Sequence, residues 1–230
     1  ILFSHAAYQM AHCFSLRSTQ ISHSQAWSTE DTQAQLPEAD VLVISGFWQD
    51  EYLDHANRLR YIQSIGAGYD QFPLDTLKAR GINLANATGV NADAVSQHAM
   101  GLILALYRQL HFGRDNQKQK IWRSMISDLG AREDDLCGHT VLIVGLGAIG
   151  NHLAALSKAF GMTVVGVKRN IDDYSGPADE VVSPERFPDQ LARADVVVLC
   201  CPLTDQTREL MNDGAFNAMK KSAYLVNVAR

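Results

Sequence analysis

The sequence has no excess of positive charge and no long apolar run. Its 20 Lys and Arg against 25 Asp and Glu give a formal net charge of -5, which argues against a nucleic-acid or anionic-membrane partner. The longest apolar stretch, residues 99–107, is far shorter than the roughly 20 residues that cross a bilayer. Ser4 and His5 interrupt the apolar start of the chain, so no signal peptide is expected. These features predict a cytoplasmic protein without membrane segments.

Cysteine is also scarce. Cys13, Cys137, Cys200 and Cys201 include no CxxC pair, and their irregular spacing argues against a disulfide framework. The eight histidines show no metal-ligand spacing beside them, so no metal site is expected. Two adjacent cysteines in an apolar run are more typical of inert buried thiols than of nucleophiles.

Short apolar runs alternate with helical patterns, which predicts an α/β fold with doubly wound parallel sheets. Residues 27–37 are polar and weakly patterned, and we expect a loop there. A helix over residues 74–80 should end at Gly81, since glycine is favoured just after a helix C-terminus. The other elements expected in this half are strands at residues 1–3, 41–44, 61–65 and 82–85 and a helix at residues 8–16.

A long helix is expected over residues 92–110, with Asn91 as its N-cap. Apolar side chains on nearly all of its sides predict that it is buried between two packed units. The next segment, residues 113–132, is mostly polar, with Ile121, Trp122 and Met125 among its few large apolar residues. We expect it to form a connector or an oligomer-contact arm.

The second half repeats the α/β pattern. We therefore expect two Rossmann-like domains with a cleft between them, the first at residues 1–97 and the second at residues 98–230. The elements expected in the second domain are strands at residues 140–144, 163–167, 194–200 and 223–228 and an amphipathic helix at residues 148–160.

The strongest single motif is the GxGxxG string that starts at Gly145. It follows an apolar strand directly and opens an amphipathic helix that leads to a second strand, as the dinucleotide-binding fingerprint requires. Gly145 permits the tight turn, Gly147 lets the backbone approach a pyrophosphate, and Gly150 lets the helix pack on the strand. Amides near Ala148 and Ile149, at the helix N-terminus, would face the phosphates.

The end of the next strand indicates which nucleotide is bound. NAD-binding proteins place a carboxylate there for the ribose 2′-hydroxyl, whereas this chain has Lys168 and Arg169. Two cations suit a 2′-phosphate, so we predict NADP as the cofactor, with NAD as the alternative. In that alternative the two cations form a solvated loop, and Asp172 or Asp173 reaches the ribose.

Together with further motifs, this fingerprint resembles the D-isomer-specific 2-hydroxyacid dehydrogenase family, which includes phosphoglycerate dehydrogenase and glyoxylate/hydroxypyruvate reductase. The matching segments cover nearly the whole chain in the family's order. The resemblance implies hydride transfer between NADP(H) or NAD(H) and a small 2-keto or D-2-hydroxy acid, by a homodimer. The segments are IGAGYD at 65–70, ATGVNADAV at 87–95, the glycine string at 145–150, CCPLT at 200–204 with Thr207, and VNVAR at 226–230.

The resemblance also implies residue roles. Ala67 and Gly68 match the loop whose backbone amides hold the substrate carboxylate. Arg230 matches the catalytic arginine, whose guanidinium can grip the carboxylate and polarise the keto oxygen. The other matches lie beside the cofactor: Cys201 and Pro202 at a strand end that passes the nicotinamide, Thr207, for which a helix-cap role is equally open, and Val228, Ala229 and Arg230 next to the nicotinamide ring.

The chain departs from the family pattern in one respect. The family's proton donor is a histidine, paired with a glutamate, that lies beyond the arginine, and none of the eight histidines here matches it. We therefore expect a C-terminally truncated fragment that is nearly inactive alone. The alternative is a non-catalytic NAD(P)-sensing or corepressor-type protein on the same fold. Formate dehydrogenase shares the scaffold, and no feature selects it.

The sequence does not identify the keto acid. Phe47, Trp48, Tyr69 and Phe72 lie near the expected cleft. They fit either a bulky or apolar substrate side chain or ordinary core packing.

Overall fold

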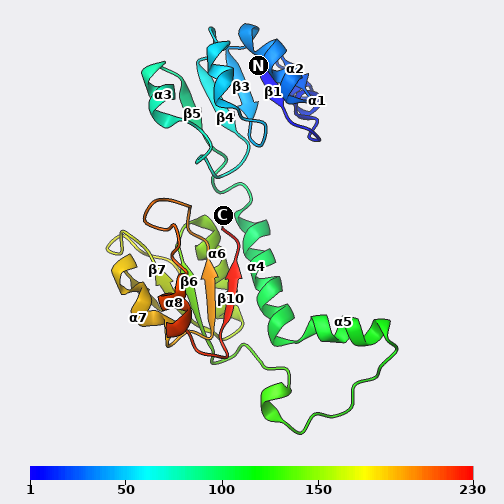
Figure 1. The fold of residues 1–230 in the computed structure, drawn as a ribbon, viewed down its shortest axis with the longest axis vertical. Helices are drawn as coiled ribbons and strands as arrows, with labels where there is room; N and C mark the ends of the chain where they lie inside the picture. Colours follow the sequence, from blue (N-terminus) through cyan, green and yellow to red (C-terminus); the bar gives the residue numbers. More distant parts are fainter. Residues whose placement is uncertain (230) are drawn as a thin grey trace. The chain divides into compact units, whose positions relative to one another are not determined.

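Two parallel β-sheets organise the chain, and a computed structural model describes its residues 1–229 (Figure 1). The first unit runs from Ile1 to Gly89, and the second begins at Val90. The strand order is β2-β1-β3-β4-β5 in the first sheet and β10-β9-β6-β7-β8 in the second, which confirms the predicted fold class. The strands are β1 (Leu2–Ser4), β2 (Ser24–Ala26), β3 (Val41–Ile44), β4 (Tyr61–Ser64), β5 (Asn83–Ala85), β6 (Thr140–Val144), β7 (Thr163–Val167), β8 (Glu180–Val182), β9 (Val196–Leu199) and β10 (Tyr224–Asn227).

The prediction of a loop at residues 27–37 is wrong, because these residues contain helix α2 (Thr29–Gln35). Ser28 caps this helix by accepting a hydrogen bond from the backbone amide of Asp31 at 3.1 Å. The helix buries Thr32, whose hydroxyl lies 2.6 Å from the Ser4 hydroxyl, instead of an apolar stripe. Hydrophobic periodicity therefore missed it. The other helical elements of this unit are α1 (Met10–Ser15), α3 (Leu74–Ala79) and the 3-10 turns Leu36–Glu38 and Asp50–Asp54.

Helix α4 (Ala92–Tyr107) is shorter than expected and belongs wholly to the second unit. The units therefore separate at Gly89–Val90 rather than at residues 97–98. Asn91 occupies the N-cap position, but its side chain accepts no capping hydrogen bond. The helix buries Ala99 and Ile103 against the second sheet, whereas Leu102 is 37% exposed, so the helix is not buried on all sides.

A projecting segment follows α4. The chain turns at Gln109, which has a φ of 51°, and continues as α5 (Leu110–Lys118), a helix without a buried residue. Figure 1 shows α5, and the chain that carries the 3-10 turn Leu129–Ala131 after it, extending from the body of the second unit. The base of this segment is tied by Arg108, which donates to the Asp134 carbonyl at 3.1 Å and the Asp135 carboxylate at 2.8 Å.

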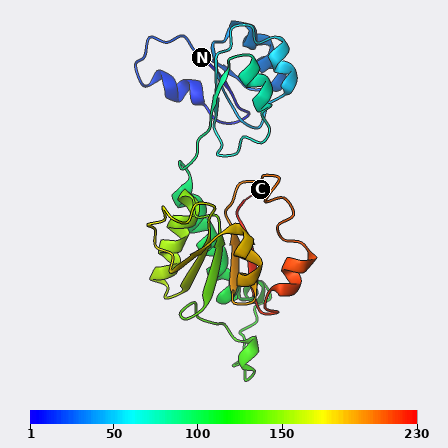
Figure 2. The ribbon, with the colours of Figure 1, turned by 90° about the vertical axis from the view of Figure 1, so that its left-hand side faces the viewer.

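Helices cover both faces of the second sheet (Figure 2). Helices α4 and α6 (Ala148–Ala159) pack on one face, and α7 (Phe187–Leu191) and α8 (Asp213–Ala218) pack on the other. The 3-10 turn Pro184–Arg186 precedes α7. Among residues 1–229, no helix combines the length and apolar character needed to cross a bilayer.

Candidate functional site

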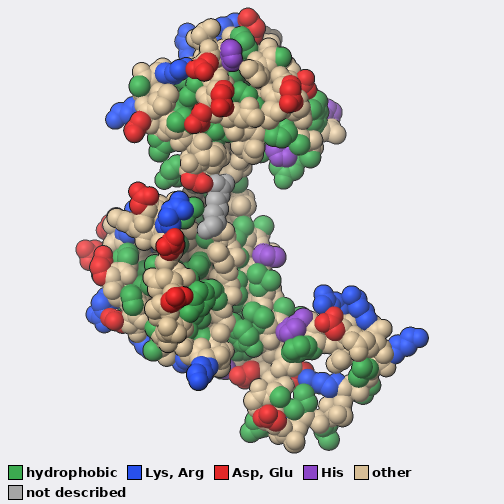
Figure 3. All heavy atoms as spheres, in the orientation of Figure 1, with side chains coloured by type: hydrophobic (Ala, Val, Ile, Leu, Met, Phe, Trp, Pro, Cys, Tyr) green, Lys and Arg blue, Asp and Glu red, His purple; other side chains and the backbone are tan. Residues whose placement is uncertain are grey.

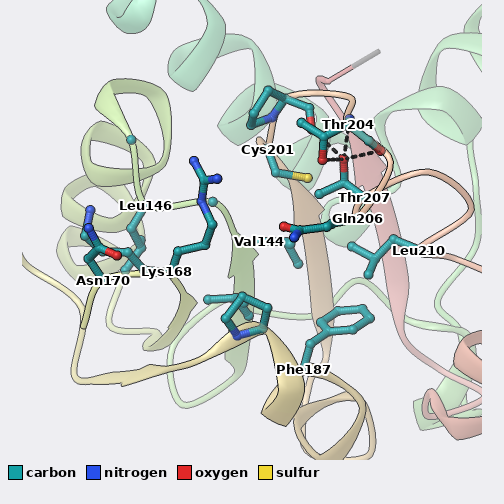
Figure 4. Close-up of a pocket in the computed structure, with 16 residues that line it drawn as sticks. Val144, Leu146, Lys168, Asn170, Phe187, Cys201, Thr204, Gln206, Thr207 and Leu210 are labelled. Atoms are coloured by element: carbon teal, nitrogen blue, oxygen red, sulfur yellow. Dashed lines mark hydrogen bonds between the residues drawn. The ribbon is translucent and has the colours of Figure 1, made fainter.

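A cavity of about 610 Å³ opens at the carboxyl ends of β6, β7 and β9 (Figure 4). Val144 and Val167 end the first two of these strands and line its floor. The strand order reverses at β6, because β7 and β8 lie on one side of it and β9 and β10 on the other. Such a switch point is where open parallel sheets bind ligands.

Two positions, one in the turn between β6 and α6 and one in the first turn of α6, have room only for glycine. Gly145 has a φ of +102°, and a β-carbon there would lie 2.9 Å from the backbone of Cys201. A β-carbon on Gly150 would lie 2.0 Å from the Gly145 carbonyl oxygen. Gly147 is different: it lines the cavity, and its β-carbon would meet no atom within 4 Å.

Helix α6 begins at this turn, with Gly147 as its N-cap and no side-chain cap. The helix start therefore offers backbone amides and the positive end of the helix dipole. Asn151 holds the turn in place by donating from Nδ2 to the Leu146 carbonyl at 3.3 Å. Ala148, Ile149 and Gly150 form the first turn of the helix, next to the cavity-lining Gly147.

One wall of the cavity carries positive charge. Lys168 and Arg169 line it directly after β7, and Asn170 follows them. The Lys168 amide donates to the Val182 carbonyl at 3.0 Å, which fixes this backbone to β8. Neither cation has an ion-pair partner among the described residues. Asp172 and Asp173 are exposed and do not line the cavity.

The opposite wall is a loop held by its own hydrogen bonds (Figure 4). Thr207 Oγ1 accepts from the Thr204 amide at 2.8 Å and donates to the Pro202 carbonyl at 2.6 Å. Thr207 therefore braces the loop and caps no helix. Figure 4 shows Cys201 on this wall, with Gln206 reaching into the space in front of Val144.

The two adjacent thiols face different surroundings. Cys200 packs against the core on the α6 face of the sheet, whereas Cys201 lines the cavity. Burial raises the pKa of the Cys200 thiol to about 12 and also raises the pKa of the Cys201 thiol. Both thiols therefore stay protonated near neutral pH and are poor nucleophiles.

The cavity brings together most of the residues predicted from the sequence in this unit, namely Gly145, Gly147, Lys168, Arg169, Cys201, Pro202 and Thr207. Val228 and Ala229 are not among its lining residues; the Val228 amide donates to the Leu199 carbonyl at 3.1 Å, just beyond β10. Arg230 lies outside the described residues. Sequence reasoning missed four lining residues, because no motif contains them: Pro184, Phe187, Gln206 and Leu210.

In the first unit, Ala67 and Gly68 lie in the loop after β4. The Ser64 hydroxyl accepts from the Gly66 amide at 3.3 Å, and the Asn86 side chain donates to the Ala67 carbonyl at 2.7 Å. These bonds fix the loop, and within residues 1–229 the backbone amides of Ala67 and Gly68 donate to no acceptor. Two fixed, unused amides can receive an anionic oxygen.

Comparison with known proteins agrees with this arrangement. Residues 100–230 match the family described as D-isomer specific 2-hydroxyacid dehydrogenase, NAD binding domain, over more than half of the chain. The chain belongs to the D-isomer specific 2-hydroxyacid dehydrogenase family. This confirms the resemblance inferred from the sequence motifs, and the cavity lies within the matched NAD-binding domain.

Members of this family with known names share about a third of the sequence. A D-3-phosphoglycerate dehydrogenase of Mycobacterium leprae is 34% identical over 203 residues, covering 86% of this chain and 37% of that protein. A glyoxylate reductase of Thermococcus kodakarensis is 33% identical over 202 residues, covering 84% of this chain and 59% of that protein. The chain therefore spans about 37–59% of the length of these curated relatives.

Solved structures match both units. A D-isomer specific 2-hydroxyacid dehydrogenase family protein from Aeromonas salmonicida matches with a TM-score of 0.83 and 31% identity, over 100% of this chain and 73% of that one. A D-lactate dehydrogenase from Aquifex aeolicus, solved with NAD and lactic acid, has a TM-score of 0.83 at 23% identity, over 100% of this chain and 69% of that one. At that identity the second match supports the fold alone.

Proposed function

We propose that the protein transfers a hydride between a nicotinamide nucleotide and a small 2-keto or D-2-hydroxy acid. The observation that carries this proposal is the cavity at the glycine turn, where Gly147 leaves open space before the start of α6. A dinucleotide pyrophosphate would lie there, against the amides of the first helical turn. When bound, the nucleotide supplies or accepts the hydride.

The preferred nucleotide in this proposal is NADP(H). Lys168 and Arg169 line the cavity after β7, where a 2′-phosphate would lie, and both are available for it. Asp172 and Asp173, the carboxylates that could receive a 2′-hydroxyl instead, are not among the lining residues. A phosphate of charge near -2 gains more from two cations than a hydroxyl does.

In this proposal the backbone amides of Ala67 and Gly68, in the first unit, bind the substrate carboxylate. The rigid loop and the two unused N–H groups support this role. Arg230, by its match to the family's catalytic arginine, would polarise the keto oxygen as it gains negative charge. Because the chain spans only part of its relatives' length, the activity is proposed for the full-length protein.

We also propose a homodimer, with the projecting segment as the contact between copies. Trp122 is 97% exposed and Met125 is 99% exposed, although both are large and apolar. Large apolar side chains that are exposed on a segment projecting from its domain are typical of a protein interface. A second copy, offering the same surface, is the occupant we propose.

The test of the proposed reaction is consumption of NADPH by a full-length version, with glyoxylate, pyruvate and 4-methyl-2-oxopentanoate as substrates. The proposal expects turnover that depends on the keto acid and on the nucleotide. Nucleotide binding without any turnover would instead favour the sensing or corepressor alternative. Absence of nucleotide binding would contradict both.

A further inference from the structure

The carboxyl edge of the first sheet carries no Lys or Arg side chain. The loops that follow its strands, at residues 5–9, 27–28, 45–50, 65–73 and 86–89, contain neither Lys nor Arg. They contain acidic residues and several aromatic ones instead. This is the edge that holds the Ala67 and Gly68 amides.

The unit has cations, but they lie elsewhere. Arg58 pairs with Glu38 and Asp40 at 3.0 Å each, in the segments that lead into β4 and β3. Arg80, at the end of α3, donates a hydrogen bond to the Leu53 carbonyl. Because the strands are parallel, these segments lie at the opposite edge of the sheet. In Figure 3 the Lys and Arg side chains of this unit gather at its top and upper left.

Aromatic side chains join the two loops nearest to the unused amides. Trp48, in the loop after β3, is partly buried and packs against the buried Phe72, in the loop after β4, with ring centroids 4.9 Å apart. The Trp48 indole N–H already donates to the Asp50 carboxylate at 2.8 Å, so it offers no further hydrogen bond. Tyr69 directly follows Gly68 and is 44% exposed.

Ser45 places this aromatic loop against the amide loop. A β-carbon on Gly66 would lie only 3.3 Å from the Ser45 hydroxyl oxygen. Residues 45–48 are thus neighbours of the loop that would hold the substrate carboxylate. A substrate bound there would extend its remaining carbons over aromatic surface rather than toward a cation.

We propose that the substrate is a 2-keto acid whose carboxylate is its only anionic group and whose side chain is apolar. This inference rests on the proposed function. A phosphate or second carboxylate held at this edge would lose hydration without gaining a Lys or Arg from these loops, whereas an apolar side chain gains contact with the Trp48 and Tyr69 rings. The site therefore disfavours phosphorylated and dicarboxylic keto acids, although a D-3-phosphoglycerate dehydrogenase is 34% identical to the chain.

The experiment measures, by calorimetry, the affinity of the protein loaded with NADP⁺, which has no hydride to give to a keto acid. The three ligands are 4-methyl-2-oxopentanoate, 2-oxoglutarate and phosphonooxypyruvate. We expect the first to bind at least about tenfold more tightly than either of the acids with a second anionic group. Equal or tighter binding of 2-oxoglutarate or phosphonooxypyruvate would overturn the inference and leave the proposed function standing. Binding of none of the three, with NADP⁺ bound, would contradict both.

A variant that adds the missing charge gives the sharper result. Ser45→Arg should raise the affinity for 2-oxoglutarate and phosphonooxypyruvate by about tenfold relative to 4-methyl-2-oxopentanoate, and Ser45→Gln should leave that ratio unchanged. NADPH affinity, which depends on the second unit, and the melting temperature report folding of each variant. The exposed Gln49→Arg places a cation on the same loop if the Ser45 variants do not fold. An unchanged ratio in every folded arginine variant would contradict the placement of the substrate side chain.

Discussion

The Gly145 carbonyl oxygen lies 2.0 Å from the point that a β-carbon on Gly150 would occupy. The turn and helix α6 thus touch with no space for a side chain. Gly150→Ala should lower the free energy of unfolding of the second unit by about 3 kcal/mol, measured by urea denaturation. Gly147→Ala is the matched control, because its β-carbon meets no atom within 4 Å and it should cost no more than about 1 kcal/mol, the loss expected for alanine at an N-cap. Equal losses in the two variants would contradict this geometry.

Removing the two cations after β7 should reverse the nucleotide preference. In Lys168→Ser/Arg169→Ser, NADPH affinity should fall at least about 100-fold, since each of the two lost charge-assisted hydrogen bonds contributes roughly 1.5–3 kcal/mol. NADH affinity should change little. Arg193→Ser removes a cation that pairs with Glu180 at 2.9 Å outside the cavity, and it should affect neither nucleotide. A preference for NADH in the unmodified protein, unaltered in the double variant, would refute the assignment.

Acid stability should depend on Asp195, which joins β6 to the segment before β10. Burial alone would raise the pKa of the Asp195 carboxyl, but hydrogen bonds from Lys220 at 2.8 Å and from the Thr140 amide at 2.9 Å hold the pKa below its usual range. The unfolded chain therefore binds this proton more readily than the folded one. The resulting stabilisation is present above the unfolded pKa, near 4, and is lost as the pH falls through the lower folded pKa.

Asp195→Asn should consequently flatten the fall in melting temperature below about pH 4. Asp189→Asn is the comparison, because its carboxylate contacts Arg186 on the surface and both side chains are exposed. Melting curves between about pH 7 and pH 2.5 give the measurement. An acid-induced fall as steep in Asp195→Asn as in the unmodified protein would count against the role given to this carboxylate.

The projecting segment should control oligomeric state. Trp122→Glu/Met125→Glu places two charges on its most exposed apolar side chains and should give a monomer in light scattering, at protein concentrations where the unmodified protein is a dimer. Leu16→Glu, at an apolar position in the first unit that is 71% exposed, should leave the dimer intact. A dimer that survives the double variant would place the contact elsewhere.

The sequence predicted the ends of a strand correctly where burial on both faces of the sheet requires a continuous apolar run. Strands β3, β6 and β7 begin and end at the expected residues for this reason. Strand β2, with the letters SQA, and strand β8, with one charged residue in three, carry no such run and were missed. Helix α4 ends earlier than expected because Gln109 turns the chain, and neither glycine nor proline marks that turn.

The candidate site could be predicted only where the backbone dictates the residue. Gly145 and Gly150 were identified because a β-carbon fits at neither position. Phe187 and Leu210 line the same cavity from segments with no motif, and only tertiary packing brings them there. The pairing of Trp48 with Phe72 shows that these two expected cleft aromatics pack on each other.

The most direct test of the account is calorimetric titration of NADPH into the chain and into Gly147→Val. The account predicts one bound nucleotide per chain and at least about tenfold weaker binding in the variant, because the valine side chain would fill the space before α6 while the fold stays intact. No binding to the unmodified chain, or equal binding to both proteins, would contradict the assignment of this cavity to the nucleotide.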